Sequence, residues 1–96
     1  MAAYVIVEIE VHDPIRYEEY RRMAGESLKT FGGRFVVRGG RAERLEGEGD
    51  PKRVVVLEFE SLERARAWHS SDAYRPARAL RQEVATARMI LVEGVA

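Results

Sequence analysis

The order of strand-type and helix-type patterns is the feature that most constrains the fold of this 96-residue chain. Apolar and polar residues alternate with the two-residue period of a strand in four segments. Between the first and second segments, and again between the third and fourth, apolar residues recur at the three- and four-residue spacing of a helix. The strands are predicted at residues 4–11, 34–38, 52–60 and 86–93.

Local start and stop signals set the limits of the two helical segments. Asp13 and Pro14 are typical of an N-cap and a first helical position, and Gly32 follows the last apolar residue of the first helix. Ser61 is the expected N-cap of the second helix. This helix is predicted to break at a polar elbow and to restart near Pro76.

The resulting order, β-α-β-β-α-β, is that of the ferredoxin-like α+β fold. It predicts one four-stranded antiparallel sheet with two helices on one face and the first and third strands in the centre. Gly39 and Gly40 predict a bulge or turn, and residues 41–51 are expected to form a hairpin connection with a short strand extension. No change of composition marks a linker, so residues 1–96 are expected to form a single domain.

Composition limits the classes of partner and cofactor. Sixteen basic residues balance sixteen acidic ones without a basic tract, so nucleic-acid binding is not expected. No apolar run approaches the length of a membrane helix and no signal peptide is recognisable, which favours a cytoplasmic protein without membrane association. The chain has no cysteine, and its two histidines lack carboxylates at ligand spacing. We therefore expect neither a metal site nor a cofactor.

Strand alternation leaves one face of the predicted sheet without a cover. The helices are expected to cover Val5, Val7, Ile9, Phe35, Val37, Val55, Leu57, Phe59, Met89 and Leu91. The opposite face would then carry Tyr4, Ile6, Val36, Val54, Val56, Ile90 and Val92. Such a patch is uncommon on monomers, and covering it is worth several kcal/mol at about 25 cal/mol per Å² of apolar area. A homodimer packed sheet to sheet is therefore predicted.

Charged residues share this uncovered face and allow two interpretations. They are Glu8, Glu10, Arg34, Arg38, Glu58, Glu60 and Arg88. In the first interpretation they are solvated or form ion pairs across the dimer. In the second they line a cavity that orients a polar ligand, and the pKa of Glu58 is raised so that it acts as an acid or base.

Short motifs spread over almost the whole chain resemble those of a known family. They are Tyr4, Asp13-Pro14, Tyr20, Gly33-Arg34-Phe35, Gly39-Gly40, Leu45-Glu46-Gly47, Arg53-Val54-Val55, Glu58-Phe59 and residues 68–74. In combination they resemble the uncharacterised bacterial domain-of-unknown-function family numbered 1330. The resemblance implies the dimeric α+β barrel superfamily, in which two sheets form a barrel across a two-fold axis. That superfamily includes cofactor-free monooxygenases, haem-degrading enzymes, muconolactone isomerases and accessory proteins, so it implies a pocket between sheet and helices but no particular reaction.

The uncovered face and the elbow of the second helix supply the candidate site residues. Glu58 and His69 are the candidate catalytic acid and base, His69 because its ordinary pKa of about 6.5 suits neutral pH. The candidate substrate-binding residues are Arg34, Trp68, Ser71 and Tyr74. Structural roles are also open to three of these six: core packing for Trp68, exposure at a helix end for His69, and a helix cap for Ser71.

Three functions are compatible with these residues. The first is a homodimer that binds a small organic molecule and has cofactor-free oxygenase or isomerase activity, which predicts an apolar cavity with a titratable group at its floor. The second is a non-catalytic ligand-binding or accessory dimer. The third is a haem-binding or haem-degrading protein, which would hold haem through His69 in an apolar slot beside the second helix.

Overall fold

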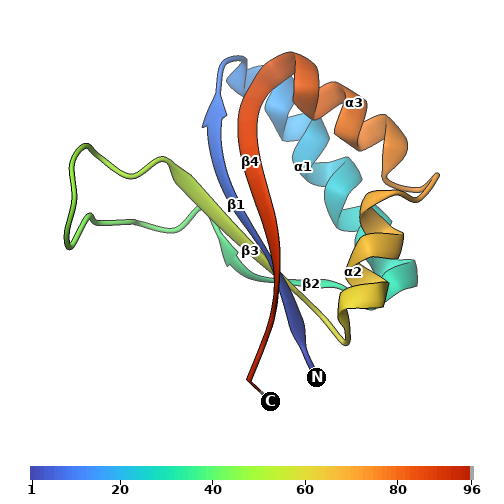
Figure 1. The fold of residues 1–96 in the computed structure, drawn as a ribbon. Coiled ribbons are helices and arrows are strands. Elements are labelled where there is room, and N and C mark those ends of the chain that lie inside the picture. The colour runs from blue at the N-terminus through green and yellow to red at the C-terminus, as the bar shows by residue number, and fades with distance from the viewer. Residues whose placement is uncertain (96) are drawn as a thin grey trace.

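The computed structural model describes residues 1–95, which form a four-stranded sheet and three α-helices (Figure 1). The elements are β1 (Ala3–Val11), α1 (Pro14–Leu28) with a 3-10 turn η1 (Lys29–Phe31), β2 (Arg34–Arg38), β3 (Arg53–Phe59), α2 (Leu62–His69), α3 (Arg75–Val84) and β4 (Ala85–Glu93). This order confirms the predicted α+β arrangement, with the second helical segment divided into α2 and α3.

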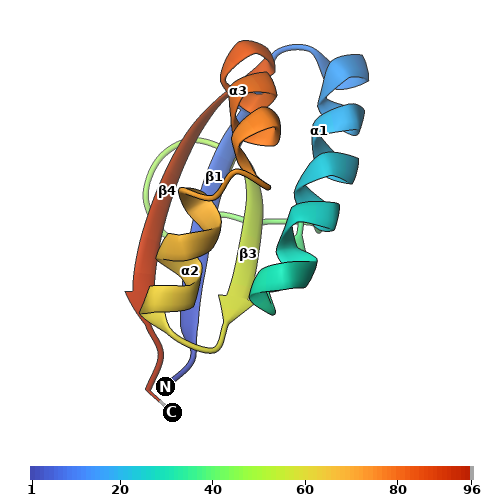
Figure 2. The ribbon, with the colours of Figure 1, turned by 90° about the vertical axis from the view of Figure 1, so that its right-hand side faces the viewer.

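The sheet has the strand order β2-β3-β1-β4, and every neighbouring pair is antiparallel. The first and third strands are therefore central, as predicted. The helices α1, α2 and α3 lie on one face of the sheet (Figure 2). Within this layer, α1 and α3 are neighbours and contact each other. No helix or strand formed by residues 1–95 covers the other face.

The predicted helix signals act as expected. The side chain of Asp13 accepts a hydrogen bond from the backbone N–H of Arg16 at 3.2 Å, and the hydroxyl of Ser61 accepts one from the N–H of Arg64 at 3.2 Å. Gly32 has a φ of 68°, the left-handed conformation that ends the α1–η1 segment.

Strand β2 contains a bulge that the sequence pattern did not predict. Phe35 is opposite Leu57 and Val37 is opposite Val56, so Val36 is the extra residue. The bulge reverses the alternation of the residues that follow. Val37, expected under the helices, is 40% exposed, and Arg38, expected on the open face, donates to the Arg21 carbonyl of α1. Both face assignments were wrong.

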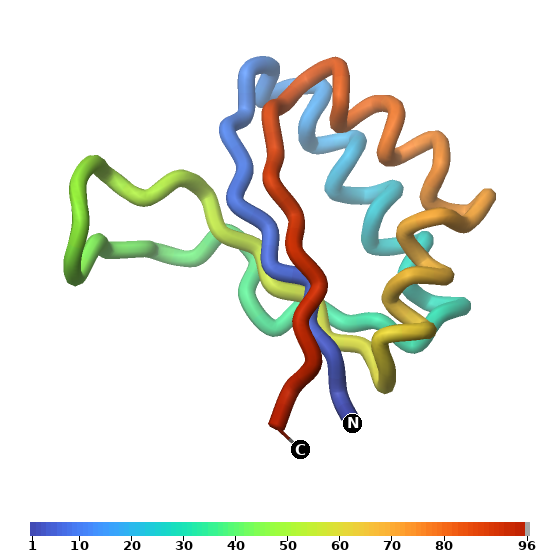
Figure 3. The backbone as a smooth tube through the Cα atoms, in the orientation of Figure 1, coloured from blue at the N-terminus to red at the C-terminus, as the bar shows by residue number. Residues whose placement is uncertain are grey.

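The connection between β2 and β3 extends away from the body of the molecule, on the side of the sheet opposite the helices (Figure 3). Residues 39–52 contain no strand, so the predicted strand extension is wrong. Gly39 begins this segment with a φ of 72°. Leu45 near its tip is almost fully exposed.

The core lies between the sheet and the helices, and aromatic residues of three elements meet in it. The Trp68 ring is 4.1 Å from the Tyr74 ring and 5.5 Å from the Phe59 ring, measured between centroids. Its indole N–H donates to the hydroxyl of Ser27 at 2.9 Å. The Tyr20 and Tyr74 hydroxyls are 2.9 Å apart in a buried hydrogen bond. The polar ends of these rings are thus satisfied inside the core.

Candidate functional site

The six predicted site residues do not meet in one place. Arg34 and Glu58 are on the open face of the sheet, where they form an ion pair. His69 lies in an open hollow between α2 and β4. Trp68 and Tyr74 belong to the buried core, and Ser71 lies in the elbow between α2 and α3.

Glu58 is held between two donors on the open face. The Tyr4 hydroxyl donates to it at 3.0 Å and Arg34 Nε at 2.6 Å. The hydrogen bond from Tyr4, followed by that from Arg34, lowers the pKa of Glu58 below its ordinary value. A general acid at neutral pH requires the opposite shift. The geometry therefore disfavours Glu58 as a general acid, and it shows the ion pair with Arg34 within one chain; ion pairs across a dimer stay a prediction.

Replacing Tyr4 with phenylalanine is expected to raise the pKa of Glu58 toward its ordinary value of 4.5, because the variant loses the hydrogen bond that lowers it most. A lowered folded-state pKa contributes stability above the unfolded-state value, and this contribution is lost as the pH falls through the folded-state pKa. The variant should therefore lose less stability on acidification than the wild type. Carboxyl NMR titration measures the shift directly, with Tyr17→Phe as a control that should leave the pKa of Glu58 unchanged. An unaltered Glu58 titration in Tyr4→Phe would refute the assignment.

His69 is exposed at the end of α2. Desolvation at this position, and after it the charges of Arg78 and Arg81, lower the pKa of His69. The ring lies 5.9 Å from Tyr74 and 6.2 Å from Trp68, measured between centroids. The hollow beside it is open to solvent and is lined on its β4 side by residues Met89, Ile90 and Leu91.

The other elbow residues have structural partners. Ser71 Oγ donates to the Trp68 carbonyl at 2.7 Å and accepts from the Tyr74 N–H at 3.1 Å, so its hydroxyl closes the turn before α3. The Tyr74 side chain is fully buried, and its hydroxyl is paired with that of Tyr20. Burial, and after it Tyr74, raises the pKa of Tyr20 well above its usual range. The Tyr20 hydroxyl therefore acts as a neutral hydrogen-bonding group and not as a base.

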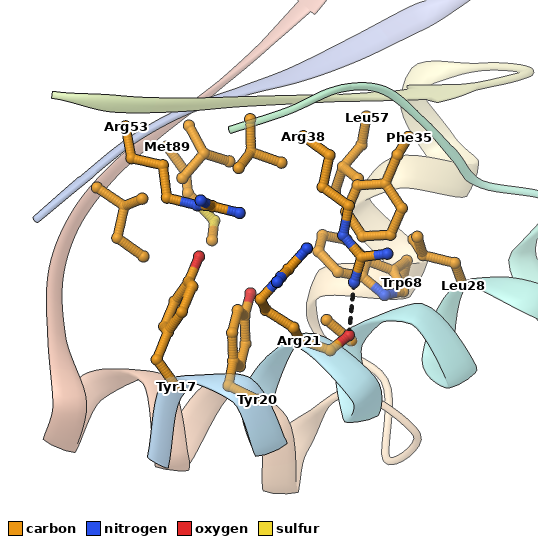
Figure 4. A pocket seen from close by; sticks show the side chains of 14 residues that line it. Tyr17, Tyr20, Arg21, Leu28, Phe35, Arg38, Arg53, Leu57, Trp68 and Met89 are labelled. Atoms are coloured by element: carbon orange, nitrogen blue, oxygen red, sulfur yellow. Dashed lines mark hydrogen bonds between the residues drawn. The ribbon is translucent and has the colours of Figure 1, made fainter. Parts of the chain in front are cut away.

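A cavity lies between α1 and the helix-facing side of the sheet (Figure 4). The space that the centre of a water molecule can occupy inside the cavity is about 30 Å³. This is room for about one or two water molecules. The lining is mostly apolar and aromatic, with Tyr17 and Tyr20 pointing from α1 toward the sheet. The lining residues are Val7, Ile9, Tyr17, Tyr20, Arg21, Ala24, Leu28, Phe35, Arg38, Arg53, Val55, Leu57, Trp68 and Met89.

Three arginines of the cavity lining were missed by the sequence reasoning. Arg21 comes from α1, Arg38 from β2 and Arg53 from β3. Of the residues predicted for the site, only Trp68 lines this cavity. Arg53 could have been predicted, because it is two residues before Val55 in the same strand and therefore faces the helices. A charged residue on that face is a signal of a site. Arg38 could not, because it faces inward only through the bulge.

Within residues 1–95, no three His, Cys, Asp or Glu side chains gather in a way that could hold a metal ion. None of the helices in this range has the length and apolar character needed to cross a membrane.

The sheet order and the single helical layer define a protein of the ferredoxin-like α+β class, and solved structures share this fold. A protein of unknown function from Rhodopseudomonas palustris has a TM-score of 0.79 at 19% identity, over 99% of this chain and 83% of that one. SnoaB, a cofactor-independent oxygenase from Streptomyces nogalater, has a TM-score of 0.71 at 14% identity, over 99% and 94%. A dimeric ferredoxin-like protein of unknown function from Jannaschia sp. CCS1 has a TM-score of 0.74 at 12% identity, over 98% and 100%.

The chain belongs to the family described as Domain of unknown function (DUF1330), which it matches over residues 2–95. This confirms the resemblance drawn from the sequence motifs. The chain has no significant match among curated proteins. At the identities given above, the structural similarities establish the fold alone.

Proposed function

We propose that this protein is a homodimer that binds a small organic molecule in the cavity between α1 and the sheet. The observation that carries the proposal is the convergence of polar groups from three elements on an apolar, aromatic-lined cavity (Figure 4). Small-molecule sites have this composition, with few polar groups placed to orient the ligand. The cavity as it stands has room for only about one or two water molecules, so ligand entry requires the partly exposed side chains at its edge to move.

The open face of the sheet supports the homodimer. Its exposed large apolar side chains are Ile6, Val36, Val37, Ile90 and Val92. The bulge adds Val37 to the predicted set and removes a charge, Arg38, so the face is more apolar than the alternation alone indicated. The connection of residues 39–52 extends on this same side (Figure 1), where it would reach around a second copy.

Binding is better supported than catalysis. No carboxylate or imidazole is among the residues that line the cavity in the described part of the chain, so a general base for proton abstraction is absent from its walls. The ionisable groups there are phenols and guanidiniums, which orient a ligand and stabilise negative charge. The proposed function is therefore that of a ligand-binding dimer.

Native mass spectrometry of protein purified under mild conditions tests this function. The expected result is a dimer mass with an additional small molecule. Ala24→Leu, which extends a side chain into the cavity, should yield the dimer without it, whereas His69→Ala in the hollow beside β4 should retain it. Circular dichroism would verify that both variants fold. Loss of the molecule in His69→Ala alone would place the site at the predicted histidine and overturn the proposal.

A cofactor-independent oxygenase is the second candidate, favoured by the similarity to SnoaB over nearly the whole of both chains. The guanidinium and phenol donors of the cavity could stabilise negative charge that develops on a bound substrate. Oxygen consumption with the molecule recovered from the dimer distinguishes the two candidates. Turnover would support the oxygenase, and retention without turnover the binding protein. Haem binding through His69 is not proposed, because the hollow at His69 is open rather than a closed slot.

A further inference from the structure

The cavity contains a concentration of positive charge that the fold does not neutralise. Arg21, Arg38 and Arg53 approach it from α1, β2 and β3, and their guanidinium groups lie near one another between helix and sheet (Figure 4). The Arg38 guanidinium packs 3.9 Å from the Phe35 ring centroid, and that of Arg53 lies 5.5 Å from the Tyr17 ring centroid. The aromatic rings hold these groups in place but provide no counter-ion.

Carboxylates are scarce around these arginines. Arg21 pairs with the exposed Glu18 at 3.2 Å. Within residues 1–95, neither Arg38 nor Arg53 has a carboxylate at ion-pair distance. Arg38 donates only to a backbone carbonyl, that of Arg21, at 2.8 Å. Three guanidiniums thus share one acidic partner.

Two donors of this cluster are buried without an acceptor. The Nε atoms of Arg21 and Arg53 have no hydrogen-bond partner among the described residues, and the one other buried nitrogen in this condition belongs to Arg81 on α3. Buried donors normally have a partner, so each exception calls for an explanation. Arg38 itself is exposed; partial desolvation, and after it the charges of Arg21 and Arg53, lowers the pKa of Arg38, as is expected where like charges gather.

The backbone leaves room for Arg53 in this position. A Cβ atom on Gly39 would overlap the guanidinium of Arg53, which would have to shift from its present position against this turn. Gly39 also has a φ of 72°, which glycine adopts without strain. The start of the β2–β3 connection is thus shaped around the guanidinium of Arg53.

From this arrangement we propose that the cavity takes a small organic carboxylate, with its anionic group bound by Arg38 and Arg53 and its apolar body directed toward Trp68 and Leu57. The proposal rests on the proposed function and specifies its ligand class. Guanidiniums bind carboxylates through paired N–H donors, which would satisfy the buried Nε of Arg53. The partly exposed arginine side chains form the edge of the cavity and move to admit the ligand.

Calorimetric titration with benzoate and with its neutral counterpart benzamide tests the charge requirement. Benzoate is expected to bind with a Kd of about 1 mM or below, and benzamide at least about tenfold more weakly. Inorganic phosphate, an anion without an apolar body, should bind more weakly than benzoate. Phosphate binding more tightly than benzoate would overturn the carboxylate assignment.

Variants locate the binding groups. Arg53→Met retains the packing of the side-chain stem and is expected to weaken benzoate binding by about tenfold or more while leaving benzamide binding unchanged. Arg38→Met should do the same. Arg75→Met, which removes an exposed arginine paired with Asp72, is the matched control and should bind benzoate as the wild type does. Because Arg53 has no acidic partner, the melting temperature of Arg53→Met should not fall.

The possible outcomes separate this inference from the proposed function. Benzamide binding as tightly as benzoate, with both lost in Ala24→Leu, would leave the cavity in place as a binding site and overturn the anion assignment. Benzoate binding that survives both Arg53→Met and Arg38→Met, or that survives Ala24→Leu, would also overturn it. Absence of benzoate binding would overturn the anion assignment as well. The proposed function is tested independently, by the small molecule bound to the dimer in native mass spectrometry.

Discussion

Replacing Trp68 with alanine is expected to lower the free energy of unfolding by about 3–5 kcal/mol. The side chain is 1% exposed and packs against Phe59 and Tyr74. Its removal creates a void among rings and leaves the buried Ser27 hydroxyl without its indole donor. Since domains of this size have about 5–15 kcal/mol of stability in total, the loss is a large share.

Chemical denaturation followed by circular dichroism measures this loss, because Trp68 is the one tryptophan of the chain and its fluorescence disappears with it. Trp68→Phe should lose less stability, since it keeps an aromatic ring between Phe59 and Tyr74. Ile15→Ala, at a position that is 85% exposed on α1, should change the stability by less than about 0.5 kcal/mol. A loss below about 1 kcal/mol in Trp68→Ala would contradict the packing described here.

Replacing Ile90 with aspartate is expected to convert the proposed homodimer into monomers. Ile90 is 60% exposed on the open face, where it pairs with Ile6 of the neighbouring strand. In a sheet-to-sheet dimer this position is covered, so the substitution buries an unpaired carboxylate, and two-fold symmetry places one in each copy. A penalty of about 3–5 kcal/mol raises the dissociation constant by at least about a hundredfold.

Sedimentation velocity over a micromolar concentration range tests this expectation. The wild type should sediment as a dimer and Ile90→Asp as a folded monomer with an unchanged circular dichroism spectrum. Ile15→Asp introduces the same charge on the outer surface of α1 and should remain dimeric. A wild type that is monomeric at these concentrations, or an Ile90→Asp variant that stays dimeric, would show that the open face is not the contact surface.

The architecture could be predicted from the sequence because its signals are local. Alternation identified the four strands, and the caps at Asp13 and Ser61 identified the helix starts, each through one hydrogen bond that the structure contains. The strand order followed from the sequence of elements, since antiparallel neighbours and helices on one face leave few arrangements. Even the division of the second helical segment was visible in its polar elbow.

The bulge could not be predicted because no residue type requires it. Val36 has the same β-branched character as Val37, and the glycines that signalled an irregularity come after the strand. Pairing with β3 selects the register, and that pairing depends on residues about twenty positions further along the chain. The face of every residue after the extra one was therefore reversed.

The candidate site was harder to predict than the fold, since a site is a meeting of side chains from distant segments. The prediction relied on polar residues at the elbow, where His69, Ser71 and Tyr74 are close to one another in the sequence. Their side chains separate into a hollow, a turn and the core. The arginines that do converge come from three elements, and no spacing in the sequence relates Arg21 to Arg53.

The extra residue in β2 links ligand chemistry to assembly. If Val36 were paired regularly and the bulge were absent, Val37 would face the cavity and Arg38 would face the proposed partner subunit. Loss of the bulge would thus change the charge of the cavity and the polarity of the contact surface together. In relatives of this protein that keep a residue at this position, ligand preference and oligomeric state would both depend on whether β2 is bulged.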